Sequence, residues 1–393
     1  MRYSSFVDRI AGEGAEAWQI HDAARQAQLR GEDILMLSIG DPDFSTPSLI
    51  GNAAIEAIQA GDTHYTNMSG RDDLRAQIIT RHNRRTGLNH DIDNVIVLAG
   101  AQCSLFSACQ CIAQAGDEII ILDPAYVTYE AVVRASGAEL VRVSQPAESG
   151  FRPDLGAIEA AITPRTRAIL IANPNNPTGI VMTNAELEGI ADIAKRHDLW
   201  VVSDEVYSDL VFSGVHNSIA GLPGMADRTI TISSVSKSHA MTGWRVGWAI
   251  APKQLIEHLN NLALAMLYGL PGFIQNAATA ALAAGEDIVT DMRNTYRGRR
   301  DRAFDILSKA NHLHCELPQA GMFLMVDIRA TGLSGSEFAW SLLRERHVSV
   351  LDATAFGKCA EGHIRLSFTL SEEQTEEACC RLADHVSQLL STG

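Results

Sequence analysis

From about residue 93 onward, short apolar runs rich in valine and isoleucine alternate with stretches of helical periodicity. The runs are NVIVLAG, EIIILDP, AELVRV, RAILIANP, LWVVSDE, TITISS and WRVGWAIA. A continuous apolar run of this kind is typical of a strand buried on both faces, with the intervening helices as covering layers. The pattern therefore predicts an α/β fold with a mostly parallel central sheet flanked by helices.

The regular alternation ends near residue 290. A long charged helical pattern then leads to FLMVDI, VSVL, HIRLSF and a last helix from Ser371, which predicts a smaller α+β domain. We expect an N-terminal segment (1–45) that joins the small domain, a large cofactor-binding domain (46–290) and a small C-terminal domain (291–393). A chain of 393 residues is long enough for this division.

Composition narrows the class of protein. The chain has 32 Lys and Arg against 47 Asp and Glu, a net charge of −15, which disfavours binding to nucleic acid or to an anionic membrane surface. The N-terminal stretch lacks an apolar signal segment, and the longest charge-free run, 260–285, is broken by Pro and Gly, so no membrane span is expected. Seven cysteines without a CxxC pair predict neither a disulfide framework nor a metal cluster, and they favour the cytoplasm.

Lysine is scarce, and one lysine stands in a different context from the rest. The lysines are Lys195, Lys237, Lys253, Lys309 and Lys358. Four of them lie on predicted helices or polar edges, where a solvated position is the ordinary explanation. Lys237 instead follows the buried run TITISS in a serine-rich turn, at the end of a strand where an open parallel sheet binds its ligands.

Other reactive side chains follow neighbouring runs in the same way. Asn176 lies in NPNNPTG after RAILIA, Asp204 and Tyr207 follow LWVVS, and Arg245 comes shortly after Lys237. Pyridoxal phosphate needs a lysine for its imine, an acid at its pyridine nitrogen and a cup for its phosphate. The set therefore predicts a site for pyridoxal phosphate, with no metal.

The chain carries a series of motifs that resembles the class I/II aminotransferases in order and spacing. They are GDPDFSTP, GDTHYTNMSG, NPNNPTG, SDEVYSDL, SVSKSHAMTGWRVGW and HIRLSF, and the resemblance covers about residues 35–370. It implies fold type I, pyridoxal phosphate as cofactor and transamination by a ping-pong mechanism. Lys237 would be both the attachment point of the cofactor and the group that moves the proton at the substrate α-carbon.

The resemblance also assigns roles around the cofactor. Asp204 matches the aspartate at the pyridine nitrogen, and Tyr207 and Asn176 match the donors to the phenolic oxygen. Tyr126 stands where an aromatic side chain stacks on the ring. A helix N-terminus and an arginine suit a phosphate, and the implied phosphate cup consists of Ala101, Gln102, Ser234, Ser236 and Arg245.

Further matches concern the substrate and the quaternary structure. Arg365, in HIRLSF, matches the arginine that holds the substrate α-carboxylate by a two-point contact, which suits a guanidinium. Gly40 marks a close backbone approach to the same substrate, beside Asn176. Tyr65 matches the tyrosine that reaches the cofactor phosphate of a neighbouring subunit, so the resemblance implies a homodimer with shared active sites.

The N-terminal stretch MRYSSFVDRIAGEGAEAW and several internal segments resemble the branch of the family that transfers the amino group of arginine to pyruvate. L-arginine is therefore the expected donor and pyruvate the expected acceptor. Glu13, Glu16 and Asp22 are candidate partners for a guanidinium, and Trp18 and Tyr268 are candidates to line the same pocket.

Other functions stay open at this point. An aromatic or aliphatic donor is the main alternative, because Trp18, Tyr268 and Met266 suit an apolar pocket, whereas no motif identifies the second cation that an acidic donor needs. The motifs do not separate transamination from a β-lyase reaction. A regulator with this fold would need an additional DNA-binding domain, and no GxGxxG follows a strand as a dehydrogenase requires. Asp41 and Asp43 are expected to be turn residues only.

Overall fold

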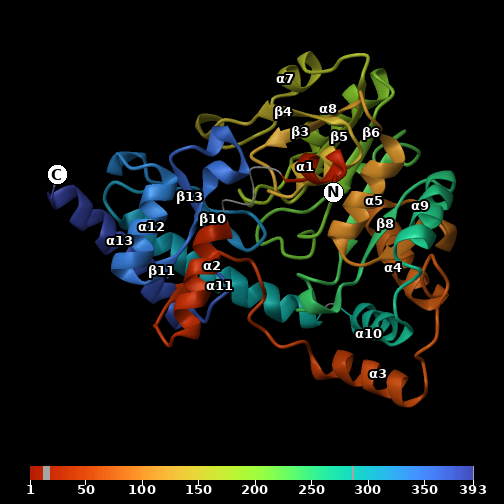
Figure 1. Ribbon diagram of the computed structural model, residues 1–393, viewed down its shortest axis with the longest axis horizontal. Helices are drawn as coiled ribbons and strands as arrows, with labels where there is room; N and C mark the ends of the chain where they lie inside the picture. The colour runs from red at the N-terminus through yellow and green to blue at the C-terminus, as the bar shows by residue number, and fades with distance from the viewer. Residues whose placement is uncertain (12–17, 286, 393) are drawn as a thin grey trace.

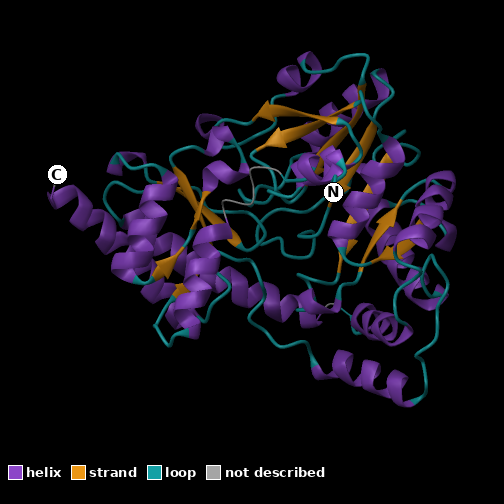
Figure 2. Ribbon diagram, in the orientation of Figure 1, coloured by secondary structure: helices purple, strands orange, loops and turns teal. Residues whose placement is uncertain are grey.

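The computed structural model describes residues 1–11, 18–285 and 287–392 (Figure 1). A seven-stranded sheet lies at its centre, in the order β2-β8-β7-β6-β5-β3-β4. Its strands are β2 (Val95–Leu98), β3 (Glu118–Asp123), β4 (Glu139–Ser144), β5 (Thr166–Ala172), β6 (Trp200–Asp204), β7 (Thr229–Ser234) and β8 (Gly247–Ile250). β8 runs antiparallel to both of its neighbours, and the other pairings are parallel. The predicted mostly parallel sheet with helical cover is confirmed (Figure 2).

The apolar runs form this sheet because successive side chains enter cores on its two faces. Ile119 and Ile121 of β3 pack into one core, beneath α5 (Ala101–Ile112), α6 (Tyr129–Ala135) and α9 (Lys253–Met266). Ile120 and Leu122 pack into the other core, beneath α7 (Leu155–Ala160) and α8 (Asn184–Arg196). A strand covered on both faces cannot alternate apolar and polar residues, which explains the unbroken runs.

Three further helices cover the β2 edge of the sheet: α3 (Ser48–Gln59), α4 (Asp72–Thr86) and α10 (Gly272–Ala283). The charge-free run 260–285 forms the end of α9 and the whole of α10. Helix α3 packs on α10 at the periphery of the molecule (Figure 1) and leaves Leu49, Ile55 and Ile58 exposed. Among the described residues, no helix has the length and apolar character needed to cross a membrane.

A second, smaller group of elements lies at the other end of the molecule (Figure 1). Its antiparallel sheet has the order β12-β13-β10-β9, and β1 pairs in parallel with β11. The strands are β1 (Leu35–Met36), β9 (His314–Cys315), β10 (Phe323–Asp327), β11 (Val348–Ser349), β12 (Leu351–Asp352) and β13 (His363–Ser367). The helices are α2 (Trp18–Leu29), α11 (Asp287–Lys309), α12 (Gly335–Arg346) and α13 (Glu372–Thr392).

The N-terminal residues divide between the two groups of elements. Ile20, Ala24 and Leu37 enter the core of the small group, together with residues of α12 and α13. The short helix α1 (Ser5–Arg9) instead contacts α6, and the Arg9 side chain donates to the carbonyl of Arg134. The domain boundaries at residues 45 and 290 stay a prediction.

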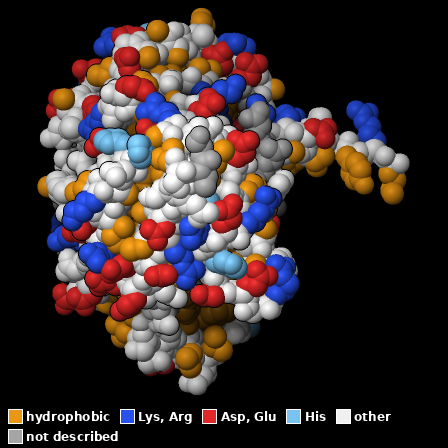
Figure 3. Space-filling view, turned by 90° about the vertical axis from the view of Figure 1, so that its left-hand side faces the viewer, with side chains coloured by type: hydrophobic (Ala, Val, Ile, Leu, Met, Phe, Trp, Pro, Cys, Tyr) orange, Lys and Arg blue, Asp and Glu red, His pale blue; other side chains and the backbone are white. Residues whose placement is uncertain are grey.

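Neither the surface charge nor the cysteines of the described residues indicate a further binding site. On the face shown in Figure 3, acidic and basic side chains intermingle and do not gather by sign. All seven cysteines are free, and no cluster of metal-ligating side chains occurs among the described residues.

Candidate active site

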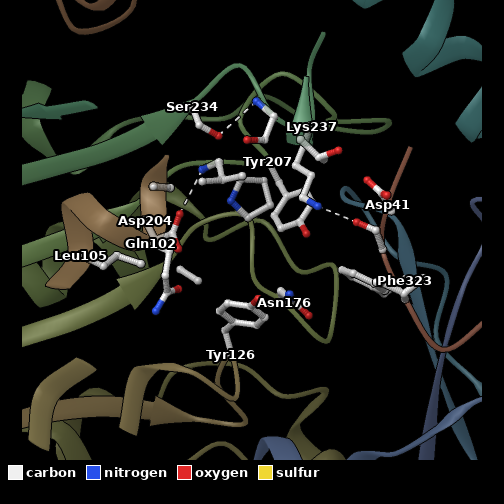
Figure 4. Close-up of a pocket in the computed structure, with 18 of the residues that line it drawn as sticks. Asp41, Gln102, Leu105, Tyr126, Asn176, Asp204, Tyr207, Ser234, Lys237 and Phe323 are labelled. Atoms are coloured by element: carbon white, nitrogen blue, oxygen red, sulfur yellow. Dashed lines mark hydrogen bonds between the residues drawn. The ribbon is translucent and has the colours of Figure 1, made fainter. Parts of the chain in front are cut away.

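A cavity of about 360 Å³ lies where the ends of the central strands face the small sheet (Figure 4). Its lining holds every residue expected to bind the cofactor or the substrate α-carboxylate, other than Tyr65: Gly40, Ala101, Gln102, Tyr126, Asn176, Asp204, Tyr207, Ser234, Ser236, Lys237, Arg245 and Arg365. Most of them stand at or just beyond the ends of β2, β3, β5, β6 and β7, which is where parallel strands bring distant parts of the sequence together.

Lys237 follows β7 and points into this cavity, between Tyr207 and Asp41 in the view of Figure 4. Its Nζ donates a hydrogen bond of 2.5 Å to the carbonyl of Gly40. Burial lowers the pKa of Lys237 to about 8, although the nearby Asp41 charge works in the opposite direction. A substantial fraction of the amine is therefore neutral, and nucleophilic, just above neutral pH.

Asp204 is the last residue of β6, and its carboxylate is held by two neutral donors. The Tyr129 hydroxyl donates to Oδ2 over 2.7 Å, and the Val206 backbone N–H donates to Oδ1 over 3.2 Å. Burial raises the pKa of Asp204 to about 6, and the hydrogen bond from Tyr129 counteracts part of that rise. Tyr129 was not among the site residues expected from the sequence; the signal for its role is a buried hydroxyl, which must find a partner.

The first turn of α5 forms an anion cradle at the end of β2. Gly100 is its N-cap, with φ of 85°, and no described side chain caps the turn. The Arg245 guanidinium donates to the carbonyls of Thr242 (2.8 Å) and Ala99 (3.4 Å). The positive φ favours glycine at this position, and a Cβ there would lie 2.5 Å from Nη2 of Arg245, so the end of that side chain would have to move. Free N–H groups beside an arginine suit a phosphate.

Arg365, on β13, is buried and makes no ion pair with any described residue. Its Nη1 donates to Asn176 Oδ1 over 3.2 Å and its Nη2 to the carbonyl of Ser38 over 2.9 Å, whereas Nε lacks a partner in the described part of the chain. Burial lowers the pKa of Arg365 to about 10, so the group still carries its charge at neutral pH. A buried cation with unused donors suits an anionic ligand.

Two tyrosines complete the cavity wall. Tyr126 lies edge-on to Tyr129, with ring centroids 5.9 Å apart, and Tyr207 lies edge-on to Phe323 at 6.1 Å. Burial raises the pKa of both hydroxyls, so each remains a protonated donor at neutral pH.

Of the remaining candidate site residues, Trp18 lines the cavity, whereas Tyr65, Tyr268 and Asp22 do not. Trp18 lines the cavity at the start of α2. Tyr65 is 83% exposed, outside the cavity of its own chain, and its ring lies 4.8 Å from that of Tyr268. Asp22 is exposed on α2.

Asp41 and Asp43 differ from the expectation that they are turn residues only. Asp41 lines the cavity, and Asp43 forms two hydrogen bonds of 2.8 Å with Arg299, so neither is only a turn residue. Glu13 and Glu16 lie outside the described residues.

A partly buried lysine, a partly buried aspartate and an anion cradle around one cavity define an enzyme that uses pyridoxal phosphate. The residues fit that group, because α5 offers an uncapped first turn, Asp204 offers an acid to the ring nitrogen, and the volume suits a small cofactor. Residues 32–382 match the family model for aminotransferase class I and II. The chain belongs to this family and is a pyridoxal-phosphate-dependent aminotransferase, with an amino acid and a 2-oxo acid as its substrates.

Known relatives cover nearly the whole chain. The arginine–pyruvate transaminase AruH of Pseudomonas aeruginosa is 52% identical over 390 residues, which is 99% of each chain. An aspartate aminotransferase of Musicola paradisiaca is 36% identical over 98% of this chain and 97% of its own. The solved structure of Thermus thermophilus aspartate aminotransferase with maleate superposes with a TM-score of 0.93 at 34% identity, covering 98% of this chain and all of that one. The expected fold type is thereby confirmed.

The anion cradle generates a testable prediction at Gly247. A Cβ at this position would lie 2.4 Å from the Ala101 nitrogen and 2.5 Å from the Gly100 carbonyl carbon, and backbone atoms cannot move aside as a side chain end can. Gly247→Ala should therefore displace the first turn of α5 and weaken pyridoxal phosphate binding, by roughly tenfold or more, in a spectrophotometric titration. Gly243→Ala, which adds its Cβ to open space, is the matched control and should bind normally.

Proposed function

We propose that this aminotransferase transfers the α-amino group of L-arginine to pyruvate. The observation that carries the proposal is the 52% identity with an arginine–pyruvate transaminase over 99% of both chains. The charges of the cavity support it, because its described cations are Lys237, Arg245 and Arg365, and each has another task in the proposed mechanism. None of them is left to bind the second carboxylate of an acidic donor.

The cofactor-binding residues act on different parts of one bound group. When bound, pyridoxal phosphate supplies the electron sink for bond breaking at the substrate α-carbon. Lys237 holds it covalently and moves the proton at that carbon, and Asp204 keeps the pyridine nitrogen protonated. Tyr207 donates to its phenolic oxygen, as does the Asn176 amide, whose own oxygen is engaged by Arg365.

Other residues position the cofactor and the substrate. The Tyr126 ring would stack on the cofactor ring. The cradle residues that would hold the cofactor phosphate are Ala101, Gln102, Ser234, Ser236 and Arg245. Arg365 binds the α-carboxylate that donor and acceptor share, using the donors that no described residue occupies, and Gly40 allows the close backbone approach. One carboxylate site serves both half-reactions, as a ping-pong mechanism requires.

The donor is tested by a panel of L-amino acids with pyruvate as acceptor. We expect kcat/KM for arginine to exceed that for leucine, phenylalanine, alanine and aspartate by at least roughly tenfold, the discrimination that one charge-assisted contact provides. Absorbance of the bound cofactor should bleach on addition of arginine and return with pyruvate. If leucine or phenylalanine reacts as fast, the apolar lining by Trp18 and Phe323 reads the side chain and the arginine assignment is wrong. Release of ammonia, pyruvate and a thiol from an S-alkyl cysteine, offered without an acceptor, would indicate the β-lyase alternative.

Lys237 should be the only lysine that carries the cofactor. Borohydride reduction followed by peptide mapping is expected to locate the label on Lys237, and Lys237→Ala should abolish the half-reaction. Because only the neutral amine attacks the cofactor, the rate at which apoenzyme takes up pyridoxal phosphate should rise with pH and level off above about 8. Lys253→Ala, which removes a surface lysine paired with Asp91, is the control and should react normally. A label on any lysine other than Lys237 would refute the assignment.

Tyr129 is expected to support Asp204. Tyr129→Phe removes a hydrogen bond that lowers the pKa of Asp204, so the aspartate should be protonated at higher pH and hold the pyridine nitrogen less well. We expect kcat to fall roughly tenfold and the acid limb of its pH profile to move to higher pH. Tyr296→Phe is matched to it, because that buried hydroxyl has no hydrogen-bond partner among the described residues. Equal profiles for the two variants would contradict the role.

A homodimer with shared active sites completes the proposal. Tyr65 is exposed beside Tyr268, and α3 presents Leu49, Ile55 and Ile58 to solvent, which supports a partner subunit on this side. Sedimentation equilibrium should give the mass of two chains, and Tyr65→Phe should weaken cofactor retention without unfolding the protein. A fully active monomer would rule the dimer out.

The seven free thiols support a cytoplasmic location.

A further inference from the structure

We propose that the phenyl rings of Phe323 and Phe356 stabilise the buried guanidinium of Arg365 in place of a counter-anion, and so keep its N–H donors available for the substrate carboxylate. Phe356 is a positioning residue in this account, because it acts through Arg365. The inference rests on the carboxylate-binding role given to Arg365 above.

The two rings lie at close range. The Arg365 Cζ is 4.0 Å from the centroid of the Phe323 ring and 4.6 Å from that of the Phe356 ring. Both phenylalanines are buried, with 3% and 0% of their surface exposed. A cation over the face of an aromatic ring is attracted by the ring quadrupole, and the attraction grows when water is excluded.

A second buried arginine of the same chain, Arg299, is instead neutralised by a carboxylate. Arg299 also has aromatic neighbours, but its Cζ is 5.3 Å from the Phe44 centroid and 5.6 Å from that of Tyr296. Its charge is balanced by Asp43, which accepts two hydrogen bonds of 2.8 Å. That carboxylate occupies the guanidinium edge that a ligand would need. Arg365 has closer rings and no such partner among the described residues.

The difference matters because the two kinds of stabilisation use different parts of the guanidinium. A carboxylate binds the N–H edge, whereas a phenyl ring attracts the cation through the face of the planar group. The described partners of the Arg365 edge are two neutral acceptors, one from Asn176 and one from Ser38, and Nε is left without any. The rings thus offset part of the cost of burying the charge without consuming these donors.

Backbone pairing and close packing hold both rings in place. Arg365 of β13 pairs with Met325 of β10, and Phe323 lies two residues from Met325 on the same face of that strand. The Phe323 ring already packs closely on Gly40, because a Cβ added to Gly40 would lie only 2.3 Å from the ring. The ring therefore has no room to shift in that direction. The carbonyl of Phe356 accepts a hydrogen bond of 2.8 Å from the Ala125 N–H, which ties its loop to the segment after β3.

The test replaces Phe356 in the holoenzyme by phenylalanines with one, two and three ring fluorines, which weaken the ring quadrupole stepwise with little change of volume. We expect KM for the amino donor and for the 2-oxo acid acceptor to rise together at each step, by roughly tenfold over the series, with a smaller change in kcat. The matched control is the same series at Phe338, a buried ring in the core of the small group of elements, where KM should not change. A flat KM series at Phe356, or an equal rise at Phe338, overturns the proposal.

A second comparison separates this inference from the role of Arg365 itself. The unsubstituted enzyme is offered the amine that corresponds to the donor without its carboxylate. If that amine reacts as well as the amino acid, Arg365 does not bind the carboxylate, and both the role and the inference fall. If the amine reacts far more slowly while the fluorine series is flat, the inference alone falls. If Phe356 variants do not fold, as judged by thermal unfolding, the same series at Phe323 gives the decision.

Discussion

The active site depends on ionisable side chains that are partly or fully buried without being paired with one another. Lys237 is held by a backbone carbonyl, Asp204 by a hydroxyl and a backbone N–H, and Arg365 by an amide oxygen and a carbonyl. Neutral dipoles orient these groups but do not cancel their charge. Burial moves the pKa of Lys237 down to about 8 and that of Asp204 up to about 6. Each group therefore meets its ligand in a site where electrostatic interactions are stronger than in water.

The sheet could be predicted because a strand covered on both faces needs an unbroken run of apolar residues. Short runs of this kind are typical of such strands. The direction of β8 could not, because an apolar run looks the same whichever way the strand is traversed. Its antiparallel placement between β2 and β7 is a tertiary outcome. It has a consequence for the site, since it brings Gly247 against the first turn of α5 and so helps to shape the anion cradle.

Some residues of the candidate site could likewise be predicted from the sequence, and others could not. Lys237, Asp204 and Asn176 were accessible from the sequence because they stand directly after buried runs, and parallel strands bring such positions together. Tyr129 and Phe356 were not, because each is buried at a position where an aromatic core residue is the ordinary explanation. Only the contact with Asp204 or Arg365 distinguishes them. The Asp43–Arg299 pair likewise joins residues far apart in the sequence, which no local pattern encodes.

Arg365 also stands at the junction of three stretches of the chain. The guanidinium comes from β13 of the small sheet, Asn176 from the loop after β5 of the central sheet, and Ser38 from the segment after β1. Ser38 in turn accepts a hydrogen bond from Ser349, and its hydroxyl lies 3.0 Å from Nδ1 of His21 on α2. A carboxylate bound here contacts a group whose position is set by all three stretches at once. Its affinity is therefore greatest in the arrangement that brings them together, and substrate binding favours that arrangement by its differential affinity.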